Sequence, residues 1–213
     1  MASPENRFDD TYDGYREWLL GLKHYPEKPL NSRLRCLVDA IPAGSKVLDV
    51  ACGTGRVLQA AIAKGCQGRG IEISAPAVET ACQKGLDVIE GDVDSWPDNP
   101  QVSDLLFGDY DIVVFSKCLM YLGTKNEILG RLKAKSILIF QSNPNSIRNR
   151  FNGETANLMK WNKQLPYRLK DGTEIEQKSA ASLAAWAASY GFRHSKIVYG
   201  GLWARSLIMQ VSR

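Results

Sequence analysis

The sequence lacks the features that mark several large protein classes. It has no run of about 18 apolar residues, so no membrane-spanning helix is expected. It has no Gly-Lys-Ser or Gly-Lys-Thr step, which excludes a P-loop for nucleoside triphosphates. Its five cysteines form no Cys-x-x-Cys pair and it has only two histidines, so no metal site is predicted. We expect free thiols in a reducing compartment, and the polar, acidic first residues favour a cytoplasmic location over export.

Short apolar runs alternate with helical patterns through the middle of the chain, and this alternation predicts the fold class. The expected strands are residues 46–51, 68–74, 86–92, 110–116 and 135–142. Helical patterns fill the intervals after the first, second and fourth of them, which predicts a doubly wound α/β fold with a mostly parallel sheet. Near the end, two β-rich runs flank Gly200-Gly201, so the sheet should finish in an antiparallel hairpin.

The stretch "VLDVACGTGRVLQAAIAKG" (47–65) predicts a strand, a glycine turn and a helix. Ligands of such sheets bind beyond the carboxyl ends of the strands, where Gly53 and Gly55 would let a ligand approach the backbone. Leu58 stands where a dinucleotide fingerprint requires its third glycine. Asp49 would repel a pyrophosphate, but it suits a ligand with an ammonium and a sulfonium, such as S-adenosylmethionine (SAM). Alternatively, Asp49 holds the turn through structural hydrogen bonds.

Acidic residues also end the next two strands. Glu72 is placed to accept hydrogen bonds from both hydroxyls of a ribose. Asp92 could accept from the exocyclic amine of adenine, with the Val93 N–H as a donor and Ile73 covering the base. The alternative for Asp92 alone is a solvated surface loop. Three acidic strand ends in this order, after that turn, favour an adenosine-containing ligand.

These segments, "VLDVACGTG", "GIEIS", "EGDVD" and "YDIVVFSKCLMYL", resemble those of class I SAM-dependent methyltransferases over about residues 40–141. The resemblance implies a seven-stranded, Rossmann-like sheet that ends with an antiparallel strand. It also implies SAM as the cofactor, with Ser116 near its methionine end. The SAM contacts that it implies by position are Asp49, Gly53, Gly55, Glu72 and Asp92.

A narrower resemblance is to the MetW family of methionine biosynthesis. It rests on the same segments followed by "SNPNSIRNRF" and "NKQLPYRL", and extends to about residue 170. That family is linked to homoserine acylation. The resemblance therefore implies an alternative to catalysis, in which the chain is a SAM-binding accessory subunit that partners an acyltransferase.

We predict two parts, an N-terminal helical lid (1–30) and a SAM-binding methyltransferase domain (31–213). Tyr12 and Tyr15 lie in the lid and would either contact substrate or pack as core. His24 is a candidate general base or else a structural or exposed residue, whereas His194 is expected at the surface. Tyr121 would either pack in the core or form part of the wall of the substrate site.

The leading hypothesis is methylation of a small-molecule acceptor on oxygen or nitrogen. Arg148 follows the fifth strand and could bind an anionic group of that acceptor, or it could be ordinary surface charge. Residues 145–213 carry 11 Lys or Arg and four Asp or Glu, which prompts an RNA methyltransferase as a further alternative. An RNA methyltransferase would more often carry an added basic domain, and the sequence shows none, so nucleic acid is not the expected partner. A membrane is not expected as a partner either.

Overall fold

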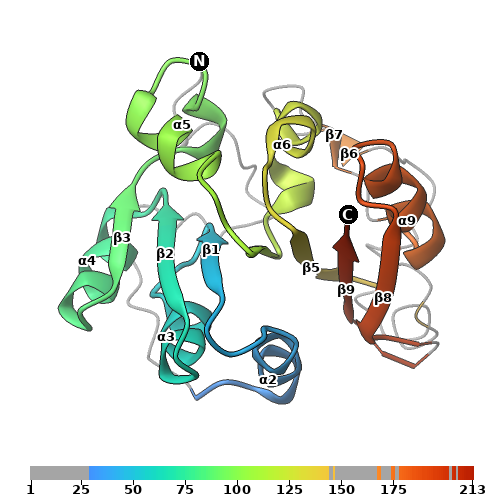
Figure 1. Cartoon of the computed structure of the whole chain (residues 1–213), viewed down its shortest axis with the longest axis horizontal. Coiled ribbons are helices and arrows are strands. Elements are labelled where there is room, and N and C mark those ends of the chain that lie inside the picture. Colours follow the sequence, from blue (N-terminus) through green and yellow to red (C-terminus); the bar gives the residue numbers. More distant parts are fainter. Residues whose placement is uncertain are drawn as a thin grey trace.

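The computed structural model describes residues 29–143, 146, 167–168, 174–175, 178–201, 203–204 and 206–213. Seven strands form one sheet in the order β3-β2-β1-β4-β5-β9-β8, with β3 at one edge and β8 at the other (Figure 1). They are β1 (Lys46–Val50), β2 (Gln67–Glu72), β3 (Asp87–Glu90), β4 (Ile112–Ser116), β5 (Ser136–Ser142), β8 (His194–Tyr199) and β9 (Ser206–Ser212). A separate pair joins β6 (Tyr167–Arg168) and β7 (Glu174–Ile175).

The predicted fold class is confirmed. Strands β3, β2, β1, β4 and β5 run parallel, and β9 pairs antiparallel with β5 and with β8. The hairpin that closes the sheet lies across Gly200-Gly201, as the sequence indicates. β1 lies between β2 and β4, so the strand order reverses beside it, and the carboxyl end of β1 lies at the topological switch point where ligands of such sheets bind.

Helices cover both faces of the sheet, and Figure 1 shows α2 and α3 on one side of the view and α5 and α6 on the other. They are α2 (Ser32–Asp39), α3 (Arg56–Ala63), α4 (Ala75–Gln83), α5 (Pro100–Leu106), α6 (Lys125–Arg131) and α9 (Ala180–Ala188). One core packs α5, α6 and α9 against the sheet, and a second packs α2 and α3 against its opposite face. A third, smaller cluster joins α3, α4 and β3.

Helix α5 was not predicted from the sequence. The Asn99 side chain accepts from the N–H groups of Gln101 and Val102, and Pro100 occupies the first helical turn, where its missing N–H is harmless. These start signals are present in the sequence. The helix has only seven residues, however, and so short an element carries little periodicity.

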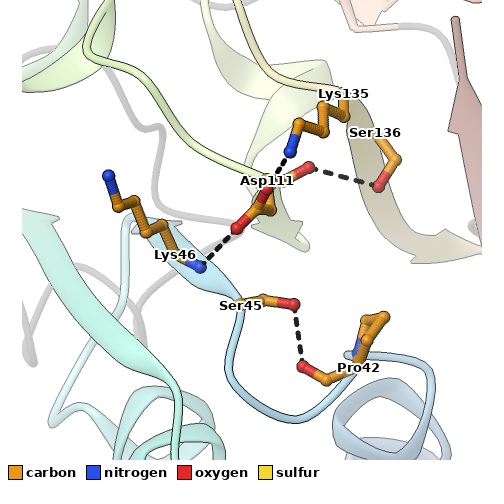
Figure 2. A network of polar contacts seen from close by, with 6 residues as sticks. All are labelled: Pro42, Ser45, Lys46, Asp111, Lys135 and Ser136. Carbon is orange, nitrogen blue, oxygen red and sulfur yellow. Dashed lines mark hydrogen bonds and ion pairs between the residues drawn. The ribbon is translucent and has the colours of Figure 1, made fainter.

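At the amino end of the sheet, Asp111 organises a polar network (Figure 2). It accepts from the Lys46 N–H at 2.8 Å and from the Lys135 ammonium at 2.6 Å. The Ser136 hydroxyl donates to the Asp111 carbonyl at 3.5 Å. This network ties the starts of β1, β4 and β5 together, far along the strands from their carboxyl ends.

Residues 1–28 lie outside the described residues, so the division between a lid (1–30) and a domain (31–213) stays a prediction. The five cysteines are free thiols, as expected; Cys66 is buried, Cys82 is exposed, and the other three are half-buried. His194 is exposed at the start of β8, as expected. Among the described residues, no helix is both long and apolar enough to cross a membrane.

Candidate functional site

The turn after β1 has a left-handed backbone at alternate residues. Ala51, Gly53 and Gly55 have φ values of 54°, 58° and 75°. Gly55 caps the start of α3, and a Cβ on it would lie 2.3 Å from Leu86 Cδ1. Its lack of a side chain therefore serves this packing contact, and its approach to a ligand stays a prediction. For Ala51 the left-handed conformation is strained, as is common at functional sites.

Glu72, the last residue of β2, fixes the path of this turn. Its carboxylate is 1% exposed and accepts three backbone hydrogen bonds. Oε2 accepts from the Gly53 N–H at 2.8 Å, and Oε1 accepts from those of Ile73 and Ser74, both at 2.9 Å. A carboxylate has about four acceptor positions, so about one remains, on Oε2. Burial raises the pKa of Glu72, and the three N–H groups oppose that rise.

Asp49 lies one residue before the end of β1, and its surroundings differ sharply from those of Glu72. The side chain is fully buried, and neither carboxylate oxygen has a hydrogen-bond partner among the described residues. Burial, and secondarily the charge of Glu72, raise the pKa of Asp49 to about 8. Because Glu72 is stabilised as a carboxylate by three N–H donors and Asp49 by none, a proton shared by the pair resides on Asp49.

A buried carboxylate without partners is costly, and such groups call for a cation or a donor. Asp49 sits at the topological switch point, beside a turn whose N–H groups and helix start face the same end of the sheet. The chemistry of this site therefore fits a ligand that brings an ammonium group to Asp49. It does not fit a pyrophosphate.

The segment after β3 holds the other predicted contacts. Asp92 caps the short helix η3 (Val93–Ser95) by accepting from the Asp94 N–H at 3.0 Å. Val93 begins that helix, so its N–H has no partner within it. Ile73 is half-buried just after β2. These positions are compatible with an adenine edge, and the assignment of Asp92, Val93 and Ile73 stays a prediction.

Asp94 has a structural role that the sequence did not reveal. It is buried and accepts from the N–H groups of Gly123 and Thr124 and from the Thr124 hydroxyl. The Trp96 indole donates to the same hydroxyl at 3.0 Å. These bonds join η3 to the segment that follows β4. No spacing in the sequence signals them, because the partners meet only in the folded sheet.

The carboxyl ends of β4 and β5 surround a cavity of about 110 Å³. Its lining comes from residues 117–121 and 139–142, so it lies next to Ser116 at the end of β4. Tyr121 is half-buried, packs against the main core and also lines the cavity, so the choice between its two expected roles stays open. Lys117 has a φ of 63°, a second strained backbone at this end of the sheet.

Four predicted residues, Tyr12, Tyr15, His24 and Arg148, lie outside the described residues, so their roles stay predictions. The structure brings Asp49, Gly53 and Glu72 together through backbone and charge contacts. The described residues include no group of three or more His, Cys, Asp or Glu placed to hold a metal ion.

Comparison with known families supports the predicted resemblance. The model of the family described as "Methionine biosynthesis protein MetW" matches residues 32–199, well over half of the chain. Among curated proteins, none has a significant sequence match.

Solved structures show the same fold at low sequence identity. A SAM-dependent methyltransferase from Archaeoglobus fulgidus has a TM-score of 0.62 and 16% identity, over 96% of this chain and 100% of that one. Burkholderia thailandensis 1,6-didemethyltoxoflavin-N1-methyltransferase, with 1,6-didemethyltoxoflavin and S-adenosylhomocysteine bound, has a TM-score of 0.61 and 15% identity, over 94% of this chain and 85% of that one. Human N-acetylserotonin methyltransferase, in complex with SAM, has a TM-score of 0.58 and 18% identity, over 85% and 52%. The chain spans about half the length of the human enzyme.

Proposed function

The chain belongs to the MetW family, and from this premise we propose that it is a SAM-dependent methyltransferase acting on a small-molecule acceptor. The observation that carries the proposal is the carboxylate of Asp49, which is buried without a hydrogen-bond partner among the described residues, at the switch point of a methyltransferase fold. The structures with similar folds include two methyltransferases crystallised with SAM or S-adenosylhomocysteine.

In this proposal each residue of the site contacts a different part of the cofactor. Asp49 accepts from its ammonium, and the free position on Glu72 Oε2 accepts from one ribose hydroxyl. Asp92 and the Val93 N–H meet the adenine edge, and Ser116 lies near the methionine end. When bound, SAM supplies an activated methyl group for in-line transfer, so the protein contributes mainly positioning and exclusion of water.

Asp49 has a specific part in binding. At neutral pH a carboxyl with a pKa of about 8 is mostly protonated in the empty protein. An arriving ammonium favours the carboxylate, so Asp49 should release its proton and gain a charge-assisted hydrogen bond. Below pH 8, affinity for the cofactor should therefore rise with pH.

The direct test is calorimetry with S-adenosylhomocysteine, which has the ammonium but no transferable methyl group. The wild type should bind it, and Asp49→Asn should bind about ten- to a hundredfold more weakly, as expected for a lost charge-assisted hydrogen bond. Asp39→Asn, on the exposed end of α2, is the matched control. Failure of the wild type to bind would refute the proposal.

The family match also favours a second function, a SAM-binding accessory subunit in methionine biosynthesis. This alternative predicts cofactor binding without turnover and co-purification with an acyltransferase. Formation of S-adenosylhomocysteine from SAM with a small-molecule acceptor, by the isolated chain, would decide in favour of the enzyme.

A further inference from the structure

Two cationic side chains lie close together at the carboxyl end of the sheet, on the face covered by α2. The Lys117 ammonium lies 5.3 Å from the centre of the Phe140 ring, and the Lys117 N–H donates to the Phe140 carbonyl at 2.7 Å. Arg33, in the first turn of α2, donates from Nη1 to the Ser206 hydroxyl at 3.1 Å. Ser206 begins β9, directly opposite the last residue of β5.

Among the described residues, neither Lys117 nor Arg33 forms an ion pair with a carboxylate. Within the described part of the chain, ion pairs join Arg69 to Asp87 and Lys135 to Asp111, but none reaches Lys117 or Arg33. The pKa of Lys117 is lowered by desolvation and, to a smaller degree, by the charge of Arg33. Although the residue is exposed as a whole, its amine is desolvated where it lies against the ring.

Two like charges repel, and an anion bound between them would replace that repulsion with attraction. Their donors are largely free: no hydrogen bond occupies the three N–H groups of the Lys117 ammonium among the described residues, and Arg33 uses one of its five. The adjoining cavity, about 110 Å³, is several times the roughly 10–15 Å³ that one water requires. It is large enough for an oxyanion group.

The backbone at Lys117 supports a functional reading of this position. Its φ of 63° is uncommon for a residue other than glycine, asparagine or aspartate. Glycine would adopt this conformation without strain, so the lysine side chain is retained at an energetic disadvantage. The conformation follows directly after β4, where the chain leaves the sheet beside the cavity.

We propose that Lys117 and Arg33 together bind a negatively charged group, a carboxylate or a phosphate, of the methyl acceptor. The inference rests on the proposed methyltransferase function, and it narrows the substrate class to acceptors that carry an oxyanion. Arg33 supplies a planar guanidinium that can bind such a group bidentately, and Lys117 supplies a second charge from the end of β4.

The experiment uses inorganic phosphate and acetate as probes of the full chain, at constant ionic strength. Binding is followed by the NMR shifts of the Lys117 and Ser206 backbone amides. For the better of the two anions, the dissociation constant should rise at least fivefold in Lys117→Met and in Arg33→Met, and Lys117→Arg should retain most of the affinity.

Two control variants remove a similar charge elsewhere. Lys133→Met lies at the amino end of the sheet, and Arg35→Met lies on α2 two residues from Arg33; both residues are exposed. Both controls should bind the probe within twofold of the wild type. An equal loss in the controls, or no localised shift in the wild type, would overturn the proposal.

Affinity for S-adenosylhomocysteine separates this inference from the proposed function. It should stay within twofold of the wild type in all five variants. A joint loss in Lys117→Met and Arg33→Met would mean that the two cations bind the cofactor's own carboxylate, which would overturn the acceptor assignment. Failure of the wild type to bind S-adenosylhomocysteine would instead refute the proposed function, regardless of the affinity measured for phosphate.

Discussion

At the amino end of the sheet, the Asp111 carboxylate is partly exposed and accepts from a backbone N–H and from the Lys135 ammonium (Figure 2). At the carboxyl end, the Asp49 carboxylate is fully buried with no partner among the described residues. The contacts of Asp111 lower its pKa, whereas burial raises the pKa of Asp49 to about 8. Asp111 therefore has its charge satisfied within the chain, whereas Asp49 has no such partner in the described part of the chain, as the proposed cofactor site requires.

The largest expected loss of stability comes from replacing Glu72, whose carboxylate fixes the turn at the carboxyl end of the sheet. Glu72→Ala would leave three N–H groups of the turn without their acceptor, and the free energy of unfolding should fall by about 4 kcal/mol. The matched control is Glu90→Ala. Glu90 lies opposite Glu72 on β3 but is exposed, and its loss should change stability by less than about 0.5 kcal/mol. Denaturant unfolding measures both, and equal effects would contradict the role given to Glu72.

The next effect depends on pH. The folded protein holds a proton on Asp49 that the unfolded chain loses near pH 3.8, so rising pH from about 4 to 8 destabilises the native state. Asp49→Asn removes this dependence and should be the more stable protein at pH 8, with a difference that grows steadily as pH rises from about 4 to 8. Near pH 4 the two proteins should be alike. Unfolding curves across this range that stay parallel would contradict the prediction.

A smaller effect is expected at the strained turn. Ala51→Gly removes the penalty of a left-handed alanine but adds the backbone entropy of glycine, for a net gain of about 0.5–1 kcal/mol. Ala60→Gly, in the middle of α3, should instead lose about 1 kcal/mol. Thermal unfolding distinguishes the signs, and a destabilised Ala51→Gly would show that this backbone is not strained.

The smallest effect is expected at the amino end. Asp111→Asn removes an ion pair in which Lys135 is largely exposed, and such pairs contribute little. The lowered pKa of Asp111 contributes stability above pH 3.8 that is lost as pH falls through the folded pKa, opposite in sign to Asp49. At pH 7 the melting temperature should change by no more than about 2 °C. A larger drop would mean that the two ends do not differ as described.

The fold was predictable because strands buried on both faces and capped helices leave local signals. The positions of Asp49 and Glu72 were predictable too, since parallel strands bring their carboxyl ends to one edge. The hydrogen bonding and protonation of each carboxylate were not predictable from the sequence. It depends on where the turn backbone passes, and that path is set by contacts with β2 and with Leu86 from beyond α4.

The cationic pair had no signal in the sequence. Lys117 is a single lysine after a strand, and its neighbours Phe140 and Arg33 come from β5 and α2. Only the sheet order, which places β4 beside β5, brings them together. Arg148, the cation that the sequence suggested for the same purpose, lies outside the described residues and stays a prediction.

The central claim is that Asp49 meets the ammonium of the cofactor, and the most direct test is to count the protons released on binding. Calorimetry of S-adenosylhomocysteine at pH 7, in two buffers of different ionisation enthalpy, gives this number. A pKa of about 8 in the empty protein predicts a release of about 0.9 proton per ligand in the wild type and close to none in Asp49→Asn. Tight binding to the wild type without proton release, or an equal release in Asp49→Asn, would contradict the account.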